Sequence, residues 1–173
     1  MLTALFLATV LVADPPKSPT TPPPTPTAPA ADAIPAATFL KEKPEDAKPV
    51  RDAKAAAKAG DKITLVGRVG GRKEPFVKGR AVFVIADPSL KACNERPDDK
   101  CKFPWDFCCE TAETMKASLA TVQIVGSDGK PMKVSAEGAG GLKPLSKVTV
   151  VGVVREVAKD GAFIIDAQGI YVE

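Results

Sequence analysis

The sequence predicts an all-β domain: a five-stranded Greek-key barrel, preceded by a short helix, with a Cys-rich insertion between its second and third strands. Segments rich in Val, Ile and Leu recur from residue 62 to the end of the printed sequence, several of them with a two-residue alternation. Asp-Gly turns join some of these segments. One long stretch with several cysteines separates the second segment from the third. Together these observations indicate a small antiparallel sheet that closes on itself.

The first two predicted strands differ in pattern. Residues 62–69 alternate between apolar and polar side chains, and Gly67 within them indicates a bend of the kind that small barrels need. Residues 80–86 are nearly all apolar, which predicts a strand covered on both faces. Asp87 and Pro88 should end this second strand.

The last three strands follow the insertion. Residues 119–125 and 131–136 predict a split third strand around an Asp-Gly turn. Residues 147–157 alternate valines with other side chains and predict the fourth strand. A second Asp-Gly turn leads into residues 162–172, which predict the fifth.

A short helix is expected over residues 49–59. Proline suits its first turn, alanine favours its interior, and Gly60 can end it. Lys54 and Lys58 near its end suit the helix dipole. Because the segment is mostly small or polar, we expect it on the domain surface.

Four parts are predicted along the chain. Residues 1–13 are interpreted as a signal peptide, because their apolar run of eleven residues is shorter than the roughly 20 needed to cross a bilayer. Residues 14–37 are rich in Pro, Thr and Ala and predict a disordered linker. Residues 38–60 continue the linker and hold the short helix, and residues 61–173 form the barrel, with the insertion at 88–118. We therefore expect an exported protein, periplasmic or extracellular, without stable membrane insertion after signal cleavage.

The composition excludes several kinds of chemistry. The chain has no histidine, so His-dependent nucleophile systems and His-ligated zinc are unavailable. A net charge of +3 provides no large basic field to attract nucleic acid or anionic membranes. No pattern assigns catalytic residues or a cofactor, so the sequence predicts a protein that is not an enzyme.

Two segments carry a family resemblance. GDKITLVGRVGG at the first strand and LKPLSKVTVVGVVREVAKDGAFIIDAQGIYV at the last two strands resemble the OB-fold, in particular nucleic-acid-binding domains of the anticodon-binding type. The whole also looks like exported bacterial OB-fold proteins. The resemblance implies a five-stranded barrel that binds ligands across its second and third strands. The helix usual between strands three and four looks reduced to residues 141–145, and the Cys-rich insertion is not part of the family pattern.

The connection between the first two strands is the candidate ligand surface that the resemblance implies. Basic residues beside an aromatic ring would suit a phosphate backbone and a stacked base. The alternative is a solvated hairpin whose Phe76 tucks under the barrel, and few other aromatic residues are available to stack bases. The candidate ligand-binding residues are Arg68, Arg72, Lys73, Phe76, Lys78, Arg80 and Trp105.

All four cysteines of the chain lie within seventeen residues, at Cys93, Cys101, Cys108 and Cys109. In an oxidising compartment an even number of clustered cysteines predicts disulfides. We expect two bonds, with none between the adjacent Cys108 and Cys109. These bonds would staple the insertion and hold Trp105 and its neighbouring phenylalanines as a miniature core.

A metal site of thiolates is the alternative. Zinc sites usually present Cys-x-x-Cys pairs, whereas here seven, six and no residues separate successive cysteines. Soft metals such as copper(I) tolerate irregular thiolate spacing better. The spacing and the compartment favour disulfides, so no metal ligand is assigned, and no Cys-x-x-Cys supports a redox-active pair.

Three functions follow from these patterns. The first is an exported, non-catalytic OB-fold binding module, stapled by disulfides, for an unidentified protein, glycan or small ligand. The second is a single-stranded nucleic-acid-binding domain with weak affinity, by resemblance. The third is an extracytoplasmic thiol-based metal-binding protein. A monomer is expected in each case.

Export predicts a mature chain that begins near Asp14, because Ala13 provides a small residue for signal cleavage. Intact-mass analysis of protein from the native host checks this. Retention of residues 1–13 on protein in the cytoplasmic fraction would contradict it.

Overall fold

The computed structural model describes residues 33–97 and 100–173. The predicted signal segment and residues 14–32 of the predicted linker lie outside the described residues. Among the described residues, no helix has both the length and the apolar character needed to cross a bilayer.

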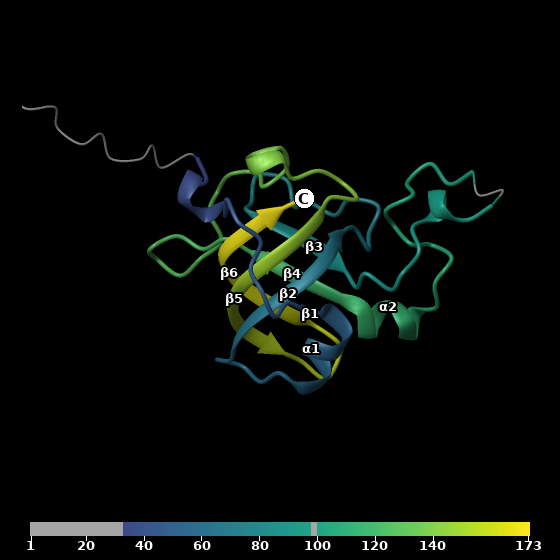
Figure 1. The fold of residues 1–173 in the computed structure, drawn as a ribbon, viewed down its shortest axis with the longest axis horizontal. Helices are drawn as coiled ribbons and strands as arrows, with labels where there is room; N and C mark the ends of the chain where they lie inside the picture. The colour runs from purple at the N-terminus through teal and green to yellow at the C-terminus, as the bar shows by residue number, and fades with distance from the viewer. Residues whose placement is uncertain (1–32, 98–99) are drawn as a thin grey trace, which may run out of the picture.

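Five strands close into a barrel (Figure 1). They are β2 (Lys62–Val69), β3 (Val82–Ala86), β4 (Leu119–Gln123), β5 (Lys147–Val157) and β6 (Phe163–Val172). The strands follow the order β2-β3-β4-β6-β5, and β5 pairs back onto β2. The β4–β6 pair is parallel and the other pairs around the barrel are antiparallel. The predicted closed five-stranded barrel is therefore confirmed, and it is compatible with an OB-like fold. A two-residue strand, β1 (Lys48–Pro49), pairs in parallel with Leu65 and Val66 of β2.

The barrel interior follows from the alternation along its strands. Leu65 and Val69 of β2 are buried together with Val150 of β5 and Ile165 of β6. β3 is buried on both faces, as its apolar sequence predicts, because its outward residues are covered by neighbouring loops. Two register shifts between β5 and β6 bend these long strands around the core.

The third strand is shorter than predicted. β4 ends at Gln123, and the expected second half at 131–136 contributes only an isolated bridge from Pro131 to Val125. The Asp-Gly turn forms as expected, with the Gly129 amide donating to the carbonyl of Gly126 at 3.0 Å. The following loop contains a three-residue helix, Ala139–Gly141, which lies just before most of the segment 141–145 where the sequence indicates a reduced helix.

The helix before the barrel, α1 (Val50–Ala56), ends earlier than predicted and is not wholly superficial. Val50 is 0 % exposed and belongs to the barrel core together with Ala53. The expectation of a surface helix was wrong for this face, because two small apolar residues three positions apart are enough to bury one stripe of a short helix.

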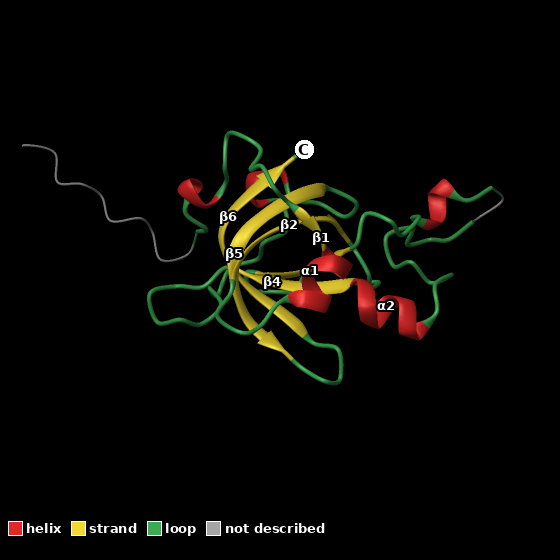
Figure 2. Cartoon of the chain, turned by 60° about the horizontal axis from the view of Figure 1, so that its bottom comes forward, coloured by secondary structure: helices red, strands yellow, loops and turns green. Residues whose placement is uncertain are grey.

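The Cys-rich insertion extends to one side of the barrel (Figure 1, right) and contains regular structure that the sequence did not predict. A three-residue helix covers Cys93–Glu95, and helix α2 covers Ala112–Ser118 directly before β4 (Figure 2). Thr111 caps α2 by accepting a hydrogen bond from the Thr114 amide at 3.1 Å. The insertion packs on the barrel through a second small core formed by four residues: Ala86, Leu90, Ala92 and Phe107.

A buried carboxylate connects α1 to the end of β3. Asp87 is 3 % exposed and accepts hydrogen bonds from the Arg51 amide at 2.8 Å, the Ser89 amide at 2.9 Å and the Ser89 hydroxyl at 2.7 Å. Burial by itself would raise the pKa of Asp87, but these hydrogen bonds outweigh it and hold the pKa below its ordinary value.

We expect Asp87→Asn to lower the free energy of unfolding at pH 7 by about 1–3 kcal/mol, since charge-assisted hydrogen bonds are lost. Because the folded-state pKa is depressed, the carboxylate stabilises the fold above its unfolded pKa of about 3.9. This effect is lost as the pH falls from that value through the lower folded-state pKa. The difference between the two proteins should therefore shrink below about pH 4. Urea unfolding at a series of pH values measures this.

The matched control is Asp52→Asn, which changes an exposed carboxylate in the first turn of the same helix. Its effect should stay below about 1 kcal/mol. An Asp87→Asn difference that is constant from pH 7 to pH 2 would contradict the assignment.

Candidate metal centre

Four side chains of the insertion direct potential metal ligands to one point. The sulfurs of Cys93, Cys101 and Cys108 and a carboxylate oxygen of Asp106 all lie within 4.8 Å of one another. Cys108 Sγ is 3.5 Å from Cys101 Sγ and 3.7 Å from Cys93 Sγ. Asp106 Oδ1 lies 3.9 Å from the Cys93 sulfur and 3.8 Å from the Cys101 sulfur.

A tight turn brings Asp106 and Cys108 to the same side of the chain. The Asp106 amide donates to the carbonyl of Phe103 at 3.0 Å, and the Cys108 amide donates to Asp106 Oδ1 at 2.9 Å. Between them Phe107 adopts a left-handed conformation with φ of 54°, uncommon for a residue with a side chain. Its ring is 1 % exposed in the second core, so packing holds the turn in this shape.

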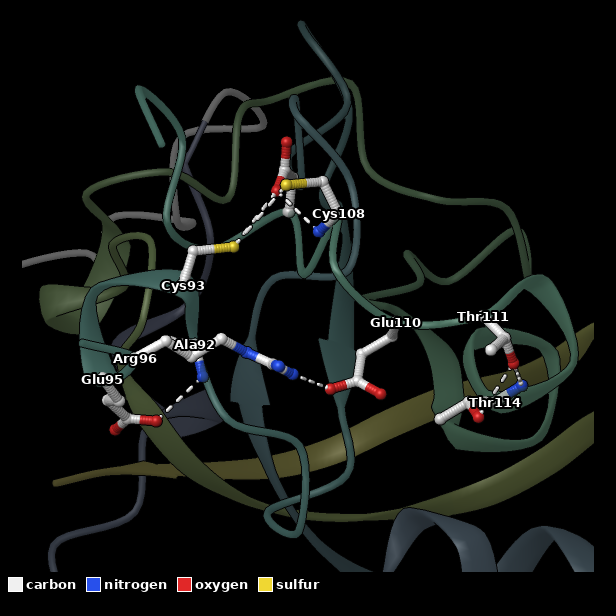
Figure 3. A network of polar contacts seen from close by, with 9 residues as sticks. Ala92, Cys93, Glu95, Arg96, Cys108, Glu110, Thr111 and Thr114 are labelled. Carbon is white, nitrogen blue, oxygen red and sulfur yellow. Dashed lines mark hydrogen bonds and ion pairs between the residues drawn. The ribbon is translucent and has the colours of Figure 1, made fainter. Parts of the chain in front are cut away.

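Cys93 reaches the cluster from a separate part of the insertion. Its amide donates to the carbonyl of Pro104 at 3.0 Å, which joins the two arms of the loop. Glu95, two residues further, accepts from the Ala92 amide at 2.8 Å and pairs with Arg68 of β2 at 2.9 Å. Figure 3 shows the sulfurs of Cys93 and Cys108 directed into the same space, beside an ion pair between Arg96 and Glu110.

Trp105 attaches this turn to the barrel. Its carbonyl accepts from the Gly71 amide at 2.7 Å, and its indole Nε1 donates to the carbonyl of Lys73 at 3.0 Å. A side chain at Gly70 would place Cβ only 2.5 Å from the Trp105 carbonyl oxygen, so glycine is required for this close approach. The connection between β2 and β3 therefore binds the turn that carries Asp106 and Cys108, and so positions the cluster against the barrel.

Two of the sulfur–sulfur separations match those expected around one tetrahedral ion. With Zn–S bonds of about 2.3 Å, two thiolates of a tetrahedral site lie about 3.8 Å apart. The observed sulfur–sulfur distances of 3.5 and 3.7 Å are close to this value. Three thiolates and one carboxylate would complete four-fold coordination.

The pKa values of two thiols in the cluster, Cys93 and Cys108, are raised above their ordinary value. Burial raises the pKa of the Cys93 thiol. The pKa of Cys108 is raised mainly by hydrogen bonding with Cys101 and then with Cys93. Metal binding would therefore release protons, as it does whenever thiols become thiolate ligands.

The two expected disulfides are not seen among these three sulfurs. An S–S bond is about 2.05 Å long, whereas the closest approaches of Cys108 to Cys101 and Cys93 are 3.5 and 3.7 Å. Cys109 is exposed and is not one of the four grouped residues. The two disulfides were predicted from the even number of clustered cysteines. The fold instead brings three sulfurs to one point, an arrangement that two separate disulfides do not predict.

The structure divides the candidate ligand-binding residues into different environments. Phe76 is buried, with its ring centroid 6.0 Å from that of Phe83, and this confirms the alternative in which it tucks under the barrel. Arg68 is engaged by Glu95. The exposed Arg72 lies outside the cavities described next.

Four of these residues share one small cavity and another lies apart. A cavity of about 170 Å³ is lined by Lys73, Phe76, Lys78 and Trp105, among others. Lys73 also lies over the ring of Phe103, 4.8 Å from its centroid. Arg80 lines a different hollow, next to the hairpin that follows β4.

Asp106 is the candidate ligand that the sequence analysis did not assign. Its spacing of Asp-x-Cys before Cys108 is the signal that could have indicated it, because such a carboxylate can bond the amide two residues on. Comparisons with protein-family models, curated proteins and solved structures gave no match for this chain.

We expect Phe76→Ala to lower the free energy of unfolding by about 3–5 kcal/mol, because it empties part of the core. Val77→Ala, at a neighbouring side chain that is 45 % exposed, should change it by less than about 0.5 kcal/mol. Chemical denaturation of both variants provides the measurement. A stable Phe76→Ala variant that has only lost oligonucleotide binding would instead support a stacking role.

Proposed function

We propose that this domain binds a zinc-type divalent metal ion through Cys93, Cys101, Asp106 and Cys108. The observation that carries the proposal is the convergence of three sulfurs and one carboxylate oxygen within 4.8 Å, from three separate positions of the insertion. Hydrogen bonds and buried aromatic packing already hold these groups in place, so little ordering is left for the ion to impose.

The ligand set favours zinc over copper(I). Thiolates suit both ions, but copper(I) selects soft sulfur ligands, whereas zinc also accepts carboxylate oxygen. Asp106 supplies this oxygen at 3.8–3.9 Å from two of the sulfurs, a separation that fits neighbouring ligands of one tetrahedral ion.

The proposed role is binding rather than catalysis. Catalytic zinc sites keep one coordination position open for water or substrate, whereas four protein ligands close the site. Cys93 is buried and Cys108 is exposed, so an ion held between them would have one side toward solvent. This arrangement supports an ion that links the arms of the insertion and can still exchange with solution.

We also retain export as part of the proposal, on the sequence of residues 1–13. The domain would then be an exported OB-fold-like module whose thiols meet an oxidising compartment. Single-stranded nucleic-acid binding, drawn from the anticodon-binding resemblance, has less support, because Phe76 is buried and Arg68 is paired with Glu95.

The test is metal titration of the full chain, purified under reducing conditions. One equivalent of Zn²⁺ should bind in competition with a chromophoric chelator. Co²⁺ should give intense visible bands and a thiolate-to-metal absorption typical of tetrahedral coordination. Cys93→Ser and Asp106→Asn should each weaken binding by at least the roughly 10- to 100-fold that loss of an outer-sphere partner costs.

Cys109→Ser is the matched control, since Cys109 is adjacent to the cluster but outside the four grouped residues. Its affinity for Zn²⁺ should equal that of the unchanged chain. Absence of stoichiometric binding, or equal losses in Cys109→Ser and Cys93→Ser, would contradict the proposed site.

A further inference from the structure

We infer that the metal site is under redox control: a low-molecular-weight disulfide oxidises Cys101 and Cys108 to an intramolecular disulfide, and the metal ion leaves. This inference rests on the proposed function and concerns the regulation of the same site. It makes the disulfide-bonded and the metal-bound insertion two states of one cluster.

Cys108 is the cysteine placed to react. It is exposed, whereas Cys93 is 0 % exposed. Its sulfur lies between the two other sulfurs, at 3.5 Å from Cys101 and 3.7 Å from Cys93. An oxidant from solution can therefore reach Cys108 before Cys93. The Cys101 sulfur is then already in van der Waals contact with the Cys108 sulfur.

Cys101 is the partner that the geometry favours. It is nearer to Cys108 than Cys93 is, and it is partly exposed. The sulfurs must approach by about 1.5 Å to reach a bonded distance of about 2.05 Å. Six residues separate the two cysteines. Cys93, by contrast, is held by burial and by the hydrogen bond that its amide donates to the carbonyl of Pro104.

The reaction balances as two thiol–disulfide exchanges. In the first, the Cys108 sulfur, which is a thiolate while it holds the ion, attacks one sulfur of the small disulfide RSSR, forms a mixed disulfide and releases RS⁻. In the second, the Cys101 thiolate attacks the Cys108 sulfur, forms the Cys101–Cys108 bond and releases a second RS⁻. The protein loses two electrons, RSSR gains them, and two protons from solvent convert the products to 2 RSH.

Loss of the ion follows from the ligands that remain. Oxidation removes two thiolates and their two negative charges, which leaves Cys93 and Asp106. Two protein ligands cannot complete the four-fold coordination that a structural zinc site requires. Release of Zn²⁺ should accordingly parallel formation of the disulfide.

The test uses the full chain, reduced and loaded with one equivalent of Zn²⁺, and oxidised glutathione as the reagent. A chromophoric chelator reports free Zn²⁺, thiol titration reports oxidation, and trypsin followed by mass spectrometry locates the bond. Lys100 and Lys102 flank Cys101, so digestion separates Cys93, Cys101 and the Cys108–Cys109 pair onto three peptides. Cys109→Ser removes the ambiguity within that pair.

The expected result is release of one Zn²⁺ for every two thiols lost, with residues 101–102 linked to residues 103–116 in both the unchanged chain and Cys109→Ser. Dithiothreitol should restore zinc binding. Retention of Zn²⁺ after the disulfide forms, a bond to Cys93 or Cys109 instead, or four intact thiols in excess glutathione disulfide would each overturn the inference while the proposed function stands. Failure of the reduced chain to bind Zn²⁺ would overturn both.

Discussion

The pairing of β2 with β5 is the constraint on which the rest of the molecule depends. Seven successive residue pairs, from Lys62–Val153 to Arg68–Lys147, close the sheet into a barrel. Closure leaves the sheet without free edges at this seam and encloses Leu65, Val150 and their neighbours in one core. Because β2 is held in this way, the glycines that follow it present a rigid surface to the insertion.

The insertion has only a small core and is held in place largely by contacts with the barrel. The Gly71–Trp105 hydrogen bond, the Arg68–Glu95 ion pair and the burial of Phe107 attach it to the barrel. Each attachment lies within a few residues of a member of the cysteine cluster. The geometry of the cluster is therefore imposed by the barrel, and an ion bound there would add a further link between the arms of the insertion.

Disulfide bonding and metal coordination compete for the same sulfurs in this cluster. The number and clustering of the cysteines, together with the export that we propose from residues 1–13, favour disulfides. The observed separations of 3.5 and 3.7 Å favour an ion between the sulfurs. The proposed exchange of Cys101 and Cys108 between a metal-bound and a disulfide-bonded form accommodates each observation. Coordination would hold the two sulfurs close enough to react, and oxidation would remove them as metal ligands.

The sequence by itself determined the barrel strands and the position of the cysteine cluster, because a two-residue alternation and Asp-Gly turns act through neighbours in the chain. It could not determine that Phe76 is buried or that Asp106 joins three sulfurs. Those outcomes depend on contacts between residues distant in sequence, such as Gly71 with Trp105 and Cys93 with Pro104. The left-handed backbone at Phe107 has no local preference behind it and is set by packing against the barrel. Only the tertiary structure could therefore decide which side chains form the site.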